Sequence, residues 1–244
     1  LLLQVDAAPQ LWRETLDDIR SANRAGLEVN GQVGCRPIGI LMGLETSVHP
    51  FATHPAWTEL EHLSPAERVS ALKNDAERRR RLVEERPSDS HTRWMTDSCM
   101  KWYELGTPPN YEPDPSNNLA ARAERTGGNV WALALDALLA EDGKAFLLFP
   151  FENYSGGNLE VVREMLLDEH TICGLGDAGA HVATICDASY PTFLITHWSR
   201  DRERGERLPL EHLVAKQTSK TARAYGLLDR GVLAPGYRAD FNVV

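Results

Sequence analysis

Short apolar segments alternate along this chain with segments whose apolar residues recur at helical spacing, and this alternation restricts the possible folds more than any other feature. Four strands are expected, at residues 1–5, 27–33, 145–151 and 171–175. A strand, a helix and a second strand in succession form a βαβ unit, in which the two strands run parallel. The sequence therefore predicts an α/β fold in which all four strands are parallel.

The helical segments carry start, face and stop signals. Trp12, Leu16 and Ile19 recur at i, i+4 and i+7, which gives a helix one apolar stripe, and Gly26 is expected to end it. Ser64-Pro65-Ala66-Glu67 combines a capping box with a proline at the first helical position. Further helices are expected at 119–139 with a break at Gly127-Gly128, at 158–167 capped by Asn158, and at 208–225.

Residues 34–115 interrupt the alternation. This stretch is rich in Pro, His and Trp, and it contains the helix that Ser64 begins. We expect it to be an insertion after a strand. Because long loops at the C-terminal face of a barrel commonly cover the substrate, the insertion is a candidate lid and specificity element.

Composition and charge exclude several classes of partner. The formal net charge is −9 and the pI is near 5.4, whereas nucleic-acid binding needs a surplus of clustered Lys and Arg. The sequence shows no apolar run of about eighteen residues and no signal-peptide pattern, so no membrane partner and a cytoplasmic location are expected. The cysteines form no C-x-x-C pair, which argues against a zinc ribbon or a redox dithiol.

The most chemically informative stretch is Gly174-Leu175-Gly176-Asp177-Ala178-Gly179-Ala180-His181. A carboxylate here directly follows an expected strand and stands among glycines, which let the backbone turn sharply and lie close to a ligand. At the C-terminal end of a barrel strand, such an Asp is placed for catalysis. The alternative is an ordinary Asp-Gly loop turn.

Several motifs carry a resemblance to a known family. Residues 226–244, GLLDRGVLAPGYRADFNVV, resemble the closing segment of the amidohydrolase superfamily. The motifs along the rest of the chain resemble the N-acyl-D-amino-acid deacylase (D-aminoacylase) branch: Arg36-Pro37-Ile38-Gly39, His49-Pro50-Phe51, Tyr111-Glu112-Pro113, Glu152-Asn153-Tyr154, Asp177 to His181, and Thr196-His197-Trp198-Ser199-Arg200-Asp201-Arg202.

The resemblance implies a TIM-type (β/α)8 barrel, of which four βα units are one half. Residues 1–226 would be the C-terminal half, strands five to eight, with the insertion at about 34–115, and residues 227–244 would return to a small β-domain. Both chain ends fall in expected strands, so we expect a fragment of a longer protein. The missing N-terminal half or a homo-oligomer would complete it, and the isolated fragment is expected to be inactive.

The resemblance also implies a site. Asp177 would be the general base and acid and a ligand of a divalent metal, with zinc expected. Gln4 and Gln32 stand where histidine ligands are expected, and neutral amides are poor zinc ligands. Weak metal binding, one ion held mostly by the missing half, and hydrolysis without metal therefore all stay open.

The candidate substrate-binding residues are His181, Asn153, Gln32 and Arg36. An Arg guanidinium matches a substrate carboxylate in a bidentate way, although a salt bridge is the ordinary alternative for Arg36. For His181 the ordinary alternative is a loop histidine bonded to a backbone carbonyl.

The resemblance implies a hydrolase of linear amides that deacylates a small N-acyl-D-amino acid by water attack. The alternatives are a cyclic amide or urea amidohydrolase, and a non-catalytic binding or scaffold domain derived from a barrel.

Overall fold

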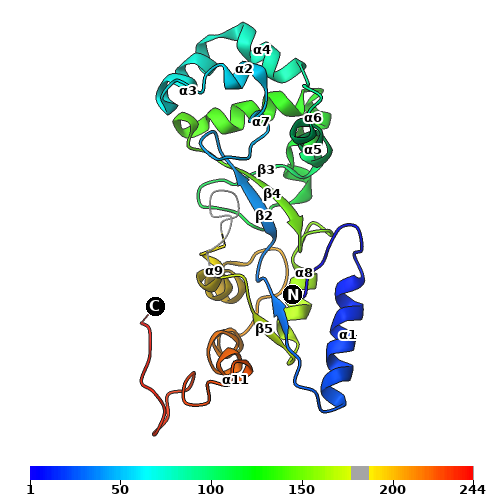
Figure 1. The fold of residues 1–244 in the computed structure, drawn as a ribbon, viewed down its shortest axis with the longest axis vertical. Helices are drawn as coiled ribbons and strands as arrows, with labels where there is room; N and C mark the ends of the chain where they lie inside the picture. The colour runs from blue at the N-terminus through cyan, green and yellow to red at the C-terminus, as the bar shows by residue number, and fades with distance from the viewer. Residues whose placement is uncertain (177–186, 244) are drawn as a thin grey trace. The chain divides into compact units, whose positions relative to one another are not determined.

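A computed structural model describes residues 1–176 and 187–243. The chain divides into two compact units (Figure 1). In the described residues, unit 1 contains 1–38, 152–176 and 187–243, and unit 2 contains Gly39–Phe151. No helix in the described residues is long and apolar enough to cross a membrane.

Unit 1 contains a parallel pair of strands flanked by helices. Strand β1 (Gly31–Val33) pairs in parallel with β5 (Thr171–Cys173), with Gly31 opposite Thr171 and Val33 opposite Cys173. In Figure 1, α1 lies to one side of this pair and α9 and α11 to the other. Its helices are α1 (Leu11–Arg24), α8 (Glu160–Leu167), α9 (Tyr190–Thr196), α10 (Leu210–Ala215) and α11 (Thr221–Ala224).

Two π-helical turns extend the C-terminal helices of unit 1. One, η4 (His197–Asp201), continues α9, and the other, η5 (Lys216–Lys220), joins α10 to α11. The helix expected at 208–225 is thus present, with a π turn in its middle. Such turns are rare and frequently lie at functional sites.

Unit 2 surrounds a three-stranded sheet with helices. The strand order is β2 (Ile38–Met42), β4 (Leu147–Glu152), β3 (Tyr103–Glu104). Its α-helices are α2 (Pro55–Thr58), α3 (Pro65–Asn74), α4 (Ala76–Glu84), α5 (Ser90–Ser98), α6 (Leu119–Thr126) and α7 (Val130–Leu139). Short 3₁₀ turns lie at Cys99–Lys101 (η1), Pro115–Asn117 (η2) and Ala140–Gly143 (η3).

A continuous apolar cluster lies within unit 2. Trp102 and Trp131 meet edge to face with ring centroids 5.2 Å apart, and Phe51 packs against Trp131 at 5.9 Å. Leucines of α7, β4 and the neighbouring helices surround these rings. This cluster excludes water from a large apolar surface, which is the main stabilising contribution expected for the unit.

The local helix signals are confirmed. Trp12, Leu16 and Ile19 are the buried residues of α1. The capping box of Ser64 and Glu67 is formed at the start of α3. Gly127 ends α6 at φ +65°, a conformation that glycine adopts without strain. At the start of α8, the Asn158 side chain accepts a hydrogen bond from the Glu160 amide.

The prediction that all four strands are parallel is wrong. The strand expected at 145–151 is β4, and it pairs antiparallel with β3, with Tyr103 opposite Leu148. Residues 1–5 contribute only isolated bridges, including a parallel one between Leu2 and Val33. The β1–β5 pair is parallel as expected. The reason for the error is that strand pairing is non-local: β4 meets a partner from within the predicted insertion.

The α/β class is therefore confirmed in its general form, as helices with small sheets, while the half barrel stays a prediction. The strand expected at 27–33 begins only at Gly31, because Leu27 and Val29 are exposed. Most of the expected insertion at about 34–115 falls in unit 2, together with α6, α7 and most of β4.

Candidate functional site

The candidate site lies in unit 1, where β5 ends. Gly174 and Gly176 follow the strand, and the Leu175 between them has φ +63°, a conformation that costs a branched side chain energy. A Cβ on Gly174 would lie 3.1 Å from Cβ of Gln32, and one on Gly176 would lie 3.1 Å from Pro191. The chain therefore turns here in a space that favours glycine. Asp177 and His181 come next in the sequence and lie outside the described residues.

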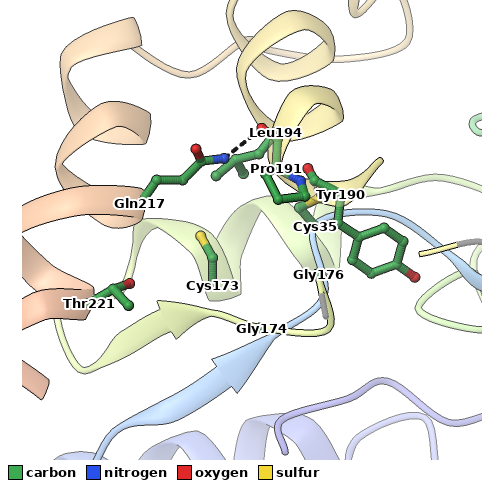
Figure 2. Close-up of a pocket in the computed structure, with 9 residues that line it drawn as sticks. All are labelled: Cys35, Cys173, Gly174, Gly176, Tyr190, Pro191, Leu194, Gln217 and Thr221. Atoms are coloured by element: carbon green, nitrogen blue, oxygen red, sulfur yellow. Dashed lines mark hydrogen bonds between the residues drawn. The ribbon is translucent and has the colours of Figure 1, made fainter. Parts of the chain in front are cut away.

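A pocket of about 200 Å³ opens beside this turn (Figure 2). The end of β5, the segment after β1, α9 and the η5–α11 helix form its walls. The lining residues are Cys35, Cys173, Gly174, Gly176, Tyr190, Pro191, Leu194, Gln217 and Thr221. None of these side chains carries a formal charge at neutral pH, so the pocket suits an uncharged group.

Both thiols in the pocket wall are kept protonated at neutral pH. The Cys35 Sγ donates to the Tyr190 carbonyl at 3.2 Å, and burial strongly raises the pKa of this thiol. Burial also raises the pKa of Cys173, to about 11. Because the thiolate is the nucleophilic form, neither cysteine is suited to nucleophilic catalysis.

Lys216 anchors the start of β5. It is fully buried, and its Nζ donates to the Asp168 carbonyl at 2.5 Å, to the Thr171 carbonyl at 2.5 Å and to Thr171 Oγ1 at 2.6 Å. Asp168 ends α8, so the ammonium also faces the negative end of that helix. Burial lowers the pKa of Lys216 to about 8. This lysine holds the turn that begins β5, six residues before Asp177.

Sequence reasoning missed Lys216. A signal was present, because Lys216 lies three residues after Leu213, on the apolar face of the expected helix. A lysine at such a position is either a long side chain reaching solvent or a buried one with carbonyl partners. Only the tertiary structure distinguishes the two.

Asn153 and Gln4 are brought together. The backbone amide of Gln4 donates to Asn153 Oδ1 at 2.9 Å, and the backbone amide of Asn153 donates to the backbone carbonyl of Gln4 at 2.8 Å. Asn153 Nδ2 donates to the Gly34 carbonyl at 3.4 Å. Asn153 is fully buried with φ +60°, so it serves as a rigid joint between two segments.

Gln32 and Arg36 each have different internal partners. Gln32 Nε2 donates to the Tyr225 hydroxyl at 2.9 Å. The Arg36 Nη1 donates to Ser189 Oγ at 2.8 Å, and its guanidinium lies 4.5 Å from the centre of the Tyr190 ring. Arg36 is only 2% exposed. The guanidinium thus fixes the start of α9, and a role in gripping substrate would have to share these contacts.

The described residues do not by themselves form a metal-binding set. Among them, no group of three or more His, Cys, Asp or Glu side chains gathers at one place. The Gln4 Oε1 accepts from the Ser155 amide at 3.2 Å, and the Gln32 amide is bonded to Tyr225. These two amides therefore take structural roles and do not replace the expected histidine ligands.

Comparison with known proteins gives one match. Residues 150–244 match the model of the amidohydrolase family. No curated protein and no solved structure matches the chain. The matched range begins at the end of unit 2 and includes Asn153, β5, Asp177 and most of the pocket wall. The match supports the amidohydrolase superfamily and, with it, a hydrolase that acts on amide or other C–N bonds.

Proposed function

We propose that the protein hydrolyses linear amides of N-acyl amino acids, in the manner of the N-acyl-D-amino-acid deacylases. The observation that carries the proposal is the family match over residues 150–244, which contains the strand end, the glycine turn and the Asp177 that follows it. A carboxylate at that position can accept a proton from the attacking water and then protonate the leaving amine.

The described residues near the proposed site are consistent with this reaction. Lys216 and Asn153 fix the backbone on either side of the site, and the pocket beside Gly176 offers an uncharged space. Asn153, Gln32, Arg36 and His181 remain the proposed substrate contacts. In this proposal a divalent metal, zinc by the superfamily's usual chemistry, would take Asp177 and other ligands from outside the described residues.

The proposal includes the architecture of the protein and the partners that would complete its site. Residues 1–226 would be the C-terminal half of a (β/α)8 barrel with an insertion at about 34–115, and 227–244 would lead into a small β-domain. The missing half of the barrel or a second copy of the chain would complete the site, and the substrate would be a small N-acyl amino acid.

The test is hydrolysis by the longest natural form of the protein, with N-acetyl derivatives of D- and L-amino acids and with a hydantoin as the cyclic amide. Asp177→Asn should lower kcat by a factor of about 10² to 10⁴, because the amide is nearly isosteric but does not accept the proton. The matched control is Asp142→Asn, whose carboxylate is 89% exposed and pairs with Lys73. This control should keep full activity.

Metal content should be measured in the same samples. Full activity in Asp177→Asn would remove Asp177 from its proposed role. A wild-type protein that hydrolyses the hydantoin and not the linear amides would favour the cyclic-amide alternative. No hydrolysis of either substrate, with or without added zinc, would favour a binding or scaffold protein.

A further inference from the structure

The residues that line the pocket beside β5 determine which chemical groups it can bind. Four of the lining side chains each donate a hydrogen bond to a backbone carbonyl. The Tyr190 hydroxyl donates to the Pro37 carbonyl at 3.3 Å, and Cys35 donates to the Tyr190 carbonyl. The Gln217 Nε2 donates to the Pro191 carbonyl at 2.6 Å. The Thr221 Oγ1 donates to the Lys216 carbonyl at 2.6 Å. None of the described side chains that line the pocket carries a positive charge that would bind a carboxylate or a phosphate.

The remaining surface is apolar. Leu194 and Pro191 line it from α9, and the Cys173 side chain points into the pocket from β5 (Figure 2). A protonated thiol behaves as a small apolar group. An apolar cavity of 150 Å³ is large enough to hold benzene, so about 200 Å³ accommodates a ring or a short aliphatic chain.

The pocket wall also includes the residue that precedes the proposed catalytic residue in the sequence. Gly176 is part of its wall, and Asp177 is the next residue in the sequence. One peptide bond therefore separates the pocket wall from the proposed base.

We propose that this pocket binds the aliphatic acyl group of the substrate and selects for its length. The proposal rests on the proposed function. An N-acyl amino acid has a charged carboxylate end and an uncharged acyl end, and the described part of the wall, which carries no cation, fits the uncharged end better. The amino-acid side chain is the competing apolar group, and the test below separates the two.

Binding is measured first, independently of turnover. Cys173 is labelled with methyl methanethiosulfonate at pH 8.5, in a Cys186→Ser background, and labelling is quantified by mass spectrometry. We expect n-hexanol to slow labelling of Cys173 at least threefold and to leave Cys99 unchanged. Cys99 is a partly buried thiol of unit 2 and serves as the internal control. Hexane-1,2,6-triol, which has the same carbon chain but is polar, should protect neither thiol.

Turnover is measured second, with an acetyl, butanoyl, hexanoyl and decanoyl series on one amino acid. Burial of each added methylene should raise kcat/KM about fourfold, up to the length that fills the pocket, beyond which no further rise is expected. Cys173→Phe fills the pocket and should abolish this dependence. Cys173→Ala, which keeps the space open, should retain the dependence.

The outcomes are distinct. Protection of Cys173 by hexanol together with a length dependence that Cys173→Phe removes supports the proposal. Equal labelling with and without hexanol overturns it, as does a length dependence that Cys173→Phe leaves intact. A kcat/KM that follows the amino-acid side chain and ignores acyl length also overturns it. Absence of any hydrolysis would refute the proposed function, and with it the acyl assignment, while hexanol protection would still show that the pocket takes apolar ligands. If Cys173→Phe does not fold, the labelling experiment on the unsubstituted pocket decides.

Discussion

Unit 2 and unit 1 are stabilised in different ways. In unit 2, a continuous cluster of aromatic and aliphatic side chains is buried, and burial keeps the imidazole of His49 neutral by lowering its pKa to about 3. In unit 1, three cations are buried: Arg36, Arg202 and Lys216 are each at most 2% exposed, and the two arginines lie over aromatic rings. Each of them donates to backbone carbonyls or to polar side chains.

The difference shows where specific geometry is required. An apolar core gains free energy from any arrangement that excludes water, whereas a buried charge is tolerated only where its partners are correctly placed. Unit 1 also contains the two π-helical turns, and its left-handed residues, Asn153 and Leu175, follow strands, whereas those of unit 2, Glu141 and Asp142, lie on an exposed turn. These features lie in the part of the chain that the family model matches or directly beside it. Strain and buried polar groups at one place are typical of functional sites.

The largest stability effect should come from the core of unit 2. Trp102→Ala should lower the free energy of unfolding by about 3 to 5 kcal/mol, because it leaves a cavity beside Trp131 and removes the hydrogen bond from Trp102 Nε1 to Ser98 Oγ. Chemical denaturation measures this. The control is Trp94→Ala, since Trp94 is 39% exposed and its loss should cost less than half as much. Equal costs would contradict the view that the buried cluster stabilises unit 2.

The second-largest stability effect should come from the buried hydrogen bonds of Asn153 in unit 1. Asn153→Ala should cost about 2 to 4 kcal/mol, since it leaves the buried Gln4 amide without an acceptor and places alanine at φ +60°. Asn153→Gly removes the same acceptor but tolerates the backbone angle, so it should cost about 1 kcal/mol less. If both variants are as stable as the wild type, the buried polar contacts of unit 1 are not what holds it together.

The buried lysine should give a smaller, pH-dependent effect. The pKa of Lys216 is about 8 in the folded protein, below its ordinary value of 10.5, so the unfolded chain binds more protons between these two pH values. Stability from this group therefore rises with pH, by about 1 kcal/mol from pH 8 to pH 9. Below pH 7 it should be nearly constant.

The measurement is the difference in unfolding free energy between wild type and Lys216→Met across pH 6 to 9. Taking the difference cancels most of the opposite contribution of Cys173, whose folded pKa is raised and whose effect lowers stability above pH 9. The nearby Lys220 disfavours the charged form of Lys216, and Asp168 favours it. A difference that does not change with pH would show that Lys216 titrates normally.

The smallest effect should come from a local cap in unit 2. Ser64→Ala should cost about 1 kcal/mol, because it removes the acceptor for the Glu67 amide at the exposed start of α3. Ser64→Thr keeps a hydroxyl and should cost less. Thermal unfolding of the two variants side by side is sufficient. A loss larger than that of Trp102→Ala would reverse the ranking of core over surface in this unit.

The parts of the fold that sequence predicted are those set by neighbouring residues. The stripe of Trp12, Leu16 and Ile19, the capping box at Ser64 and the break at Gly127 all depend on residues within one or two helical turns. The chemistry at Asp177 was likewise inferred from its glycine neighbours and a family resemblance, and the family match at 150–244 supports the superfamily.

What only the tertiary structure decided was which distant segments meet. Residues 145–151 were expected beside the other parallel strands, yet β4 pairs antiparallel with Tyr103 and Glu104 of β3. The apolar pattern of a strand does not specify the partner strand, because pairing depends on backbone groups that every residue shares.

The burial of Lys216 and the composition of the pocket wall were also decided by tertiary structure. Cys35, Cys173 and Leu194 line one pocket because distant segments of the chain meet there. The sequence by itself determined the apolar stripe of α1, the capping box of α3 and the end of α6, since these depend on local chemistry, and the role of Asp177 stays a prediction. The partners of β4, the buried charges and the pocket were determined by long-range packing, which no local pattern encodes.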